Sequence, residues 1–291
     1  MKNFEIPGAI QTVSTGALSK LVVTTGFSTA EIYLHGAHVT QFQKNGEAPL
    51  IFMSAKSHFA PGKPIRGGVP ICFPWFGPRE GEPAHGLARL LSWELAETSA
   101  AKDGSVVVRL RLPQELLKPE WSALKTEFVV TVAETLAMEL IATNESGGKA
   151  AAIENCLHTY LQVGDIGAVS LSGLEGAPFD DFAFGANGAR RKGDPARLRI
   201  TQETNRVYPD NTAAVEIRDE KLKRTVRVEK FNSKSTVVWN PWTTQPMPED
   251  WGPAEHEQMV CVESGNVKQN RLSLAPGKAA SLKVILSSHP T

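Results

Sequence analysis

Apolar and polar residues alternate with a period of two along much of this chain of 291 residues, and this pattern constrains its fold more than any other feature. The clearest case is the segment 106–112, in which valine and leucine alternate with arginine. The same pattern returns in three further segments: 128–132, 136–140 and 282–286. Strict alternation is the signature of a half-buried antiparallel strand, and helical periodicity is nearly absent. The pattern therefore predicts an all-β fold.

Further runs rich in β-branched and aromatic residues extend the expected set of strands: 30–42, 151–163, 168–172, 213–218, 225–230, 236–239 and 259–264. Turn sequences such as Lys102-Asp-Gly104 separate them, and one short helical turn is expected at 113–117. Strands at close spacing without alternating helices favour a large antiparallel β-sandwich over an α/β sheet. Because no linker composition or internal repeat is found, we expect residues 1–291 to form a single domain.

Composition excludes several classes of protein. Lysine plus arginine and aspartate plus glutamate both number 31 and are well mixed, so no basic field for nucleic acid exists. The N-terminus lacks the apolar core of a signal peptide, and no run of 18 apolar residues could span a membrane. Cys72, Cys156 and Cys261 are far apart and without metal-type spacing, which favours reduced thiols and no bound metal. We expect a cytoplasmic protein, and the absence of helical heptads favours a monomer.

The segment from Arg66 to Arg89 is the most unusual stretch of the chain. It contains three arginines, one histidine, five glycines and three aromatic residues. Glycine and proline fix the backbone where side chains must be aimed, and arginine offers a planar set of donors to an anion. A solvated surface loop is the alternative for any one of these residues, but together they indicate a rigid binding loop.

Two strands carry candidate acid and base groups. One face of the 151–163 strand carries Cys156, His158, Tyr160 and Gln162. This face is semi-polar and aromatic, as expected for the wall of a ligand cleft. A core histidine with satisfied nitrogens is the alternative for His158. Glu263 follows an apolar strand, where it would be either the first polar residue of a turn or a group facing the same cleft. If the two side chains meet, Glu263 can accept a proton and His158 can donate one.

Trp239 and Trp242 flank an Asn-Pro turn. Flat indole rings can form platforms for the apolar faces of sugars, and buried tryptophan at a strand end is the alternative.

Six segments in chain order, between about residue 30 and residue 270, together resemble the D-hexose-6-phosphate mutarotases, also called glucose-6-phosphate 1-epimerases, which are relatives of aldose 1-epimerase. They are Ile65-Arg-Gly-Gly-Val-Pro70, Cys72-Phe-Pro-Trp-Phe-Gly77, His85-Gly-Leu-Ala-Arg89, Glu203-Thr-Asn-Arg-Val-Tyr208, Trp239-Asn-Pro-Trp242 and Val260-Cys-Val-Glu263. The resemblance implies a β-sandwich of the galactose-mutarotase type. It also implies an isomerase that interconverts the α and β anomers of a hexose 6-phosphate, most naturally glucose 6-phosphate, without metal or organic cofactor.

The resemblance also implies roles for particular residues. Glu263 matches the general base and His158 the general acid of the family. Arg66 and Arg89 match the arginines that bind the substrate's phosphate, and His85 matches a contact to a sugar hydroxyl or ring oxygen.

Two positions depart from the family's pattern. Asn205 stands where many members have a substrate-contacting aspartate, so a hydrogen-bond acceptor remains but its charge is gone. Ala84 stands where some members have glutamine. Two other classes of function therefore remain open: a non-catalytic sandwich that binds or senses a carbohydrate or sugar phosphate, and a mutarotase for free aldoses.

Overall fold

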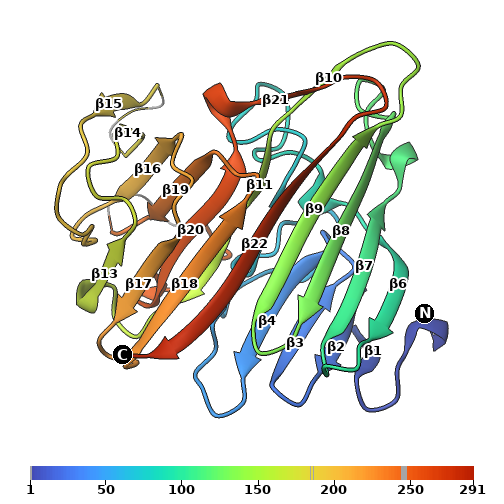
Figure 1. Ribbon diagram of the computed structural model, residues 1–291, viewed down its shortest axis with the longest axis horizontal. Helices are drawn as coiled ribbons and strands as arrows, with labels where there is room; N and C mark the ends of the chain where they lie inside the picture. Colours follow the sequence, from blue (N-terminus) through green and yellow to red (C-terminus); the bar gives the residue numbers. More distant parts are fainter. Residues whose placement is uncertain (1, 184, 186, 244–247) are drawn as a thin grey trace.

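The computed structural model describes residues 2–183, 185, 187–243 and 248–291, and these form sheets that are stacked face to face (Figure 1). Two sheets of eight strands and one of four contain nearly all of the strands. All pairings between the named strands are antiparallel. The predicted all-β antiparallel sandwich is therefore confirmed.

The first eight-stranded sheet crosses the whole molecule in Figure 1. Its strands are, in spatial order, β13 (Val169–Ser172), β17 (Val215–Asp219), β18 (Arg224–Phe231), β22 (Ala279–Pro290), β9 (Leu136–Asn144), β8 (Leu124–Val132), β7 (Val106–Leu112) and β6 (Glu94–Ala100). In β8 and β9 buried and half-buried residues alternate over all nine positions. The alternation seen in the sequence thus separates the core face of this sheet from its outer face.

The second eight-stranded sheet contains β15 (Ala189–Arg191), β14 (Phe179–Asp181), β16 (Thr204–Pro209), β19 (Ser235–Asn240), β20 (Met259–Asn266), β11 (Asn155–Leu157) and β5 (Ile71–Cys72), with β12 (Tyr160–Gln162) also paired to β20. The four-stranded sheet contains β1 (Ile10–Thr15), β2 (Leu18–Thr24), β3 (Ser28–Tyr33) and β4 (His38–Lys44). A short ribbon pairs β10 (Ala151–Ile153) with β21 (Leu272–Leu274).

The helices of the described residues are short 3-10 turns: η1 (Lys2–Phe4), η2 (Ala88–Leu90), η3 (Gln114–Leu116), η4 (Ile166–Ala168), η5 (Glu255–Gln258) and η6 (Lys268–Asn270). The helical turn expected at 113–117 is η3. Across this part of the chain, no helix has the length and apolar character that crossing a bilayer requires.

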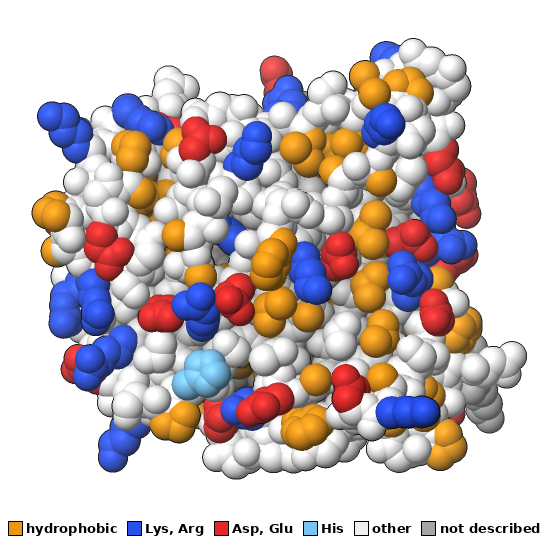
Figure 2. Space-filling view, in the orientation of Figure 1, with side chains coloured by type: hydrophobic (Ala, Val, Ile, Leu, Met, Phe, Trp, Pro, Cys, Tyr) orange, Lys and Arg blue, Asp and Glu red, His pale blue; other side chains and the backbone are white. Residues whose placement is uncertain are grey.

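One apolar core joins the sheets. Phe128 of β8, Leu21 of β2 and Val262 of β20 are each at most 1% exposed and belong to the same cluster of buried contacts. The second sheet therefore packs one face onto the core and leaves its other face available for a site. On the face of the molecule shown in Figure 2, basic and acidic side chains are interspersed, as the mixed charge of the sequence predicts.

Two of the expected strands are divided in the structure. The segment 30–42 forms β3 and β4, which are joined by a turn. The segment 151–163 forms β10, β11 and β12: β10 pairs with β21, whereas β11 and β12 both pair with β20 and are separated at His158 and Thr159. There the backbone N–H of His158 donates to the carbonyl of Pro70 at 3.0 Å, and that of Tyr160 to the carbonyl of Gly68 at 3.0 Å. The glycine-rich loop thus lies directly beside the predicted acid.

Candidate active site

A cleft opens on the face of the second sheet that is turned away from the core. In the β19–β20 pairing, Val237 lies opposite Glu263 and Trp239 opposite Cys261, and opposed residues project to the same face. The cleft has a volume of about 470 Å³. Its walls are Arg66, Phe76, Gly77, Pro78, Ala84, His85, Arg89, His158, Tyr160, Phe182, Asn205, Val207, Val237, Trp239, Glu263 and Lys268.

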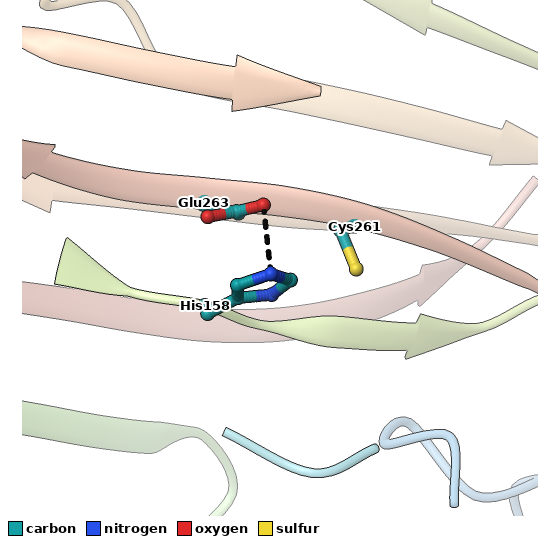
Figure 3. Close-up of side chains that lie close together, drawn as sticks. All are labelled: His158, Cys261 and Glu263. Atoms are coloured by element: carbon teal, nitrogen blue, oxygen red, sulfur yellow. Dashed lines mark ion pairs between the residues drawn. The ribbon is translucent and has the colours of Figure 1, made fainter. Parts of the chain in front are cut away.

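His158 and Glu263 meet on the floor of this cleft. His158 Nε2 lies 3.3 Å from Glu263 Oε1, and the two side chains are 10% and 2% exposed (Figure 3). The imidazole stacks on the ring of Tyr160 with centroids 4.8 Å apart. Nδ1 of His158 is buried and has no hydrogen-bond partner among the described residues. The two groups that the sequence analysis singled out are therefore in direct contact.

Burial shifts both groups toward their neutral forms. The pKa of Glu263 lies well above its usual value because the carboxyl group is buried, an effect that a hydrogen bond from Cys156 opposes. The pKa of His158 lies well below its usual value, first because of burial and then because of electrostatic interactions with His85, Arg89 and Arg66. A buried pair that holds one proton is neutral overall whichever partner carries it, so the singly protonated pair is the state that burial favours.

Thiols flank the pair on the same face. Cys156 Sγ lies 3.6 Å from Glu263 Oε2 and donates to it, and Cys72 Sγ lies 3.5 Å from His85 Nδ1. Burial raises the pKa of each of the three cysteines, and all three are free. A thiol with a raised pKa is a poor nucleophile, so these cysteines act here as small buried groups and weak donors.

Among the residues described, one group of three side chains has the spacing of a metal site. Ligand atoms of His158, Cys261 and Glu263 lie within 4.8 Å of one another (Figure 3). A nitrogen, a sulfur and an oxygen form a donor set that zinc accepts. Binding would require the thiol of Cys261 to lose a proton and the contact between His158 and Glu263 to open.

Glycine is required where the binding loop passes other backbone. Gly68 has φ +68°, and a Cβ there would overlap the imidazole of His38. Gly86 has φ +79°, and a Cβ there would overlap the carbonyl of Phe73. His85, between Ala84 and Gly86, itself has φ +65°, a conformation uncommon for residues with a side chain. This backbone places the His85 ring 5.5 Å from the ring of His158.

Both predicted phosphate-binding arginines line the cleft, but their surroundings differ. The guanidinium of Arg66 donates through Nε and Nη2 to the two carboxylate oxygens of Asp250, each at 3.3 Å. Arg89 Nη2 donates to the carbonyl of Ala84 at 2.8 Å, and its buried Nε has no partner among the described residues. The charge of Arg66 is thus already balanced, whereas that of Arg89 is not.

Of the other predicted residues, some line the cleft and some do not. Asn205 lines the cleft and is paired in register with Trp239, which also lines it. Trp242 does not line the cleft: its ring lies 5.8 Å from that of His256. The platform hypothesis stays a prediction, and of the two tryptophans Trp239 is the one that lines the cleft.

Several cleft residues were not predicted from the sequence. Phe182 follows β14 and Lys268 begins η6, while Asp250, which does not line the cleft but pairs with Arg66, lies in a connecting segment, and none has a local pattern of chemistry. Phe76 could have been predicted from the sequence, since it lies in the glycine-rich segment that was identified as a binding loop.

Known proteins resemble this chain over most of its length. The sequence profile of the family described as "Aldose 1-epimerase" matches residues 19–287. A protein from Cenchrus ciliaris named "Putative glucose-6-phosphate 1-epimerase" is 31% identical over 272 residues, which cover 90% of this chain and 82% of that protein. A protein from Escherichia coli K12 with the same name is 33% identical over 253 residues, covering 83% and 81%.

Solved structures of related proteins share the fold of this chain. The crystal structure of a "putative mutarotase" from Salmonella typhimurium has a TM-score of 0.85 at 28% identity and covers 98% of this chain and 95% of that one. Galactose 1-epimerase from Lactobacillus acidophilus has a TM-score of 0.72 at 12% identity, covering 97% and 98%. The expected galactose-mutarotase type of sandwich is therefore confirmed.

Proposed function

The chain belongs to the aldose 1-epimerase family, and from this premise we propose that it interconverts the α and β anomers of a hexose 6-phosphate, with glucose 6-phosphate as the first candidate. The observation that carries this proposal is the contact of 3.3 Å between His158 and Glu263 on the floor of a cleft that also contains Arg66 and Arg89. A titratable pair with opposed pKa shifts in a cleft is typical of a site for proton transfer.

The proposed reaction moves two protons. Glu263 removes the proton of the anomeric hydroxyl while His158 donates a proton to the ring oxygen, and the bond between C1 and the ring oxygen breaks. The sugar is then an open-chain aldehyde, Glu263 is protonated and His158 is neutral. After rotation about C1–C2, His158 takes back the proton from the C5 hydroxyl as it attacks C1, and Glu263 returns its proton to the anomeric oxygen. Each positioned proton transfer supplies about 10²–10⁴-fold acceleration.

The pKa shifts fit this cycle. The aldehyde complex has Glu263 protonated and His158 neutral, which is the arrangement that burial favours. Ring opening therefore starts from the ionised pair and ends in the neutral one, so the low-polarity floor stabilises the open-chain intermediate. The stacking of His158 on Tyr160 holds the imidazole in place during both halves of the cycle.

A mutarotase for free aldoses is the second candidate, because Asp250 already balances the charge of Arg66. Arg89, which lacks a carboxylate partner among the described residues, favours the phosphorylated substrate. The relatives named as glucose-6-phosphate 1-epimerases add support.

The test is anomer exchange followed by NMR with purified protein, in parallel for glucose 6-phosphate and glucose, with the spontaneous rate subtracted. Glu263→Gln keeps the size of the side chain but removes the base, and His158→Asn removes the acid. We expect each variant to lose roughly 10²–10⁴-fold in kcat with KM changed only a few-fold.

The kcat of the double variant should be only slightly lower than that of the less active single variant, because both residues serve one proton relay. Glu257→Gln, the same chemical change at an exposed position, is the matched control. Exchange near the wild-type rate in Glu263→Gln would contradict the proposal.

A further inference from the structure

Lys268 is a cation at the rim of the cleft that the family resemblance does not assign. Its side chain is exposed, lines the cleft and reaches over the ring of Phe182, with Nζ 5.4 Å from the ring centroid. Nζ also lies 3.3 Å from the position that a Cβ on Gly77 would occupy. Lys268 has no ion pair with any carboxylate of the described residues.

The backbone holds Lys268 in a conformation that lysine rarely adopts. Its φ is +56°, in the left-handed region. One carboxylate oxygen of Glu154 accepts the backbone N–H of Lys268 at 2.5 Å, and the other accepts that of Phe76 at 3.1 Å. Glu154 is 4% exposed. A single buried carboxylate therefore ties the backbone of Lys268 to the loop that contains Phe76 and Gly77, which also lines the cleft.

The net positive charge around the cleft nearly matches the negative charge of a phosphate monoester. Arg66 is balanced by Asp250 at 3.3 Å, and Glu154 has Arg271 at 3.8 Å. The singly protonated pair of His158 and Glu263 is neutral. Arg89 and Lys268 then leave two positive charges, and a phosphate monoester carries about −1.5 to −2 at neutral pH.

The three cations act on a common space. The pKa of His85 is lowered to about 3, mainly by burial and then by the charges of Arg89, Lys268 and Arg66. His85 belongs to the glycine-rich loop and its ring lies 5.5 Å from that of His158 on the floor, so a group bound beside it would be within the field of all three.

We propose that Lys268 binds the phosphate of the substrate together with Arg89, and that it thereby sets the preference of this site for phosphorylated over free hexoses. This inference rests on the proposed function for its substrate. Lysine acts on phosphate as a mobile point charge, so a flexible side chain at the rim can close on the phosphate after the sugar has entered.

The probe for the test is 1,5-anhydroglucitol 6-phosphate, which lacks an anomeric hydroxyl and therefore binds without reacting. Its dissociation constant is measured by calorimetry for the wild type, Lys268→Met and Lys268→Arg. Loss of a charge-assisted contact should weaken binding roughly tenfold to a hundredfold in Lys268→Met. Lys268→Arg should recover most of that loss, because it restores the charge.

Lys278→Met is the matched control, since Lys278 is exposed, lies ten residues further along the chain and does not line the cleft. It should bind the probe within about twofold of the wild type. The ratio of kcat/KM for glucose 6-phosphate to that for glucose should also fall by roughly tenfold or more in Lys268→Met.

Two results with Lys268→Met would overturn the inference: binding of the probe equal to that of the wild type, or an equal loss for the probe and for unphosphorylated 1,5-anhydroglucitol. A wild-type protein that does not bind the probe would overturn it as well. Failure of the proposed function gives a different result, namely tight binding of the probe by a wild-type protein that does not accelerate anomer exchange.

Discussion

His158 Nε2 and Glu263 Oε1 lie 3.3 Å apart, and in the proposed cycle their roles depend on how many protons the pair holds. Burial raises the pKa of Glu263 and lowers that of His158, so both shifts widen the pH range over which the pair holds one proton. A second proton would leave the buried pair with a net positive charge, and loss of the only proton would leave it with a net negative charge. The second proton occupies the base and loss of the last proton removes the acid, so either change stops the proposed cycle.

The pH dependence of kcat/KM should therefore be bell-shaped with a plateau across neutral pH. The acid limb reflects uptake of the second proton, and it should lie below 6.5 because the pKa of His158 is lowered from that value. The alkaline limb reflects loss of the last proton and should lie well above 4.5, the usual value for glutamate. Anomer exchange measured from about pH 5 to about pH 9 tests this. An acid limb above 6.5 would mean that the imidazole is not desolvated in solution.

Strand parity made His158 and Glu263 candidates for a cleft face, since side-chain direction along a strand is a local property, but it left a core histidine and a turn residue as alternatives. Whether they touch depends on the pairing of β11 and β12 with β20, which is a long-range property. The partner of Arg66 could not be predicted, because Asp250 is 184 residues away and lies outside any strand.

At the scale of elements, the break between β11 and β12 is the feature that the alternation concealed. The same parity continues from Cys156 to Tyr160, so the sequence reads as one strand. Between β11 and β12 the backbone N–H of Thr159 donates to the carbonyl of Leu157, and those of His158 and Tyr160 donate to the glycine-rich loop. The bonds to the loop join distant backbone segments, and no local propensity encodes them. The loop itself was identifiable, because its glycines adopt conformations that other residues avoid.

Glu154 joins the glycine-rich loop at Phe76 to η6 at Lys268, and its removal should destabilise both segments. In Glu154→Ala, the backbone N–H groups of Phe76 and Lys268 lose their acceptors in a part-buried setting. We expect the free energy of unfolding to fall by roughly 2 to 6 kcal/mol, since each unsatisfied donor costs about 1–3 kcal/mol. Urea unfolding followed by circular dichroism measures this. The binding of 1,5-anhydroglucitol 6-phosphate should weaken in parallel.

Glu134→Ala is the comparison for that experiment. Glu134 forms an ion pair with Lys44 at 3.4 Å, but its side chain is 69% exposed. An exposed pair of this kind contributes about 0–1 kcal/mol. If Glu154→Ala were no less stable than Glu134→Ala, the carboxylate of Glu154 would not hold the two segments together.

At the scale of the whole molecule, the class of fold was predictable and the order of the strands was not. Alternation shows that segments such as 106–112 are strands with one buried face, and this requires packed sheets. The position of β22 between β9 and β18 depends on pairing of the last strand with strands far earlier in the chain. The site depends on long-range pairing as well, because β20, which contains Glu263, pairs with β11 and β12 on either side of His158.

We propose that residues 1–291 form one folding unit, and its unfolding should be cooperative. Phe128, Leu21 and Val262 come from three different sheets and belong to one core cluster, so no sheet can lose its packing alone. Tryptophan fluorescence, far-UV circular dichroism and anomer exchange should therefore be lost with one midpoint in urea.

Phe128→Ala should shift all three signals together, with a loss of about 3–5 kcal/mol, because Phe128 is fully buried. Phe231→Ala is the control, since Phe231 is 50% exposed and its replacement should change stability by about 0.5 kcal/mol or less. Separate midpoints for fluorescence and circular dichroism, or a Phe128→Ala variant in which only one signal moves, would show that the sheets unfold independently. In that case the apolar contacts between the sheets would not make them a single domain.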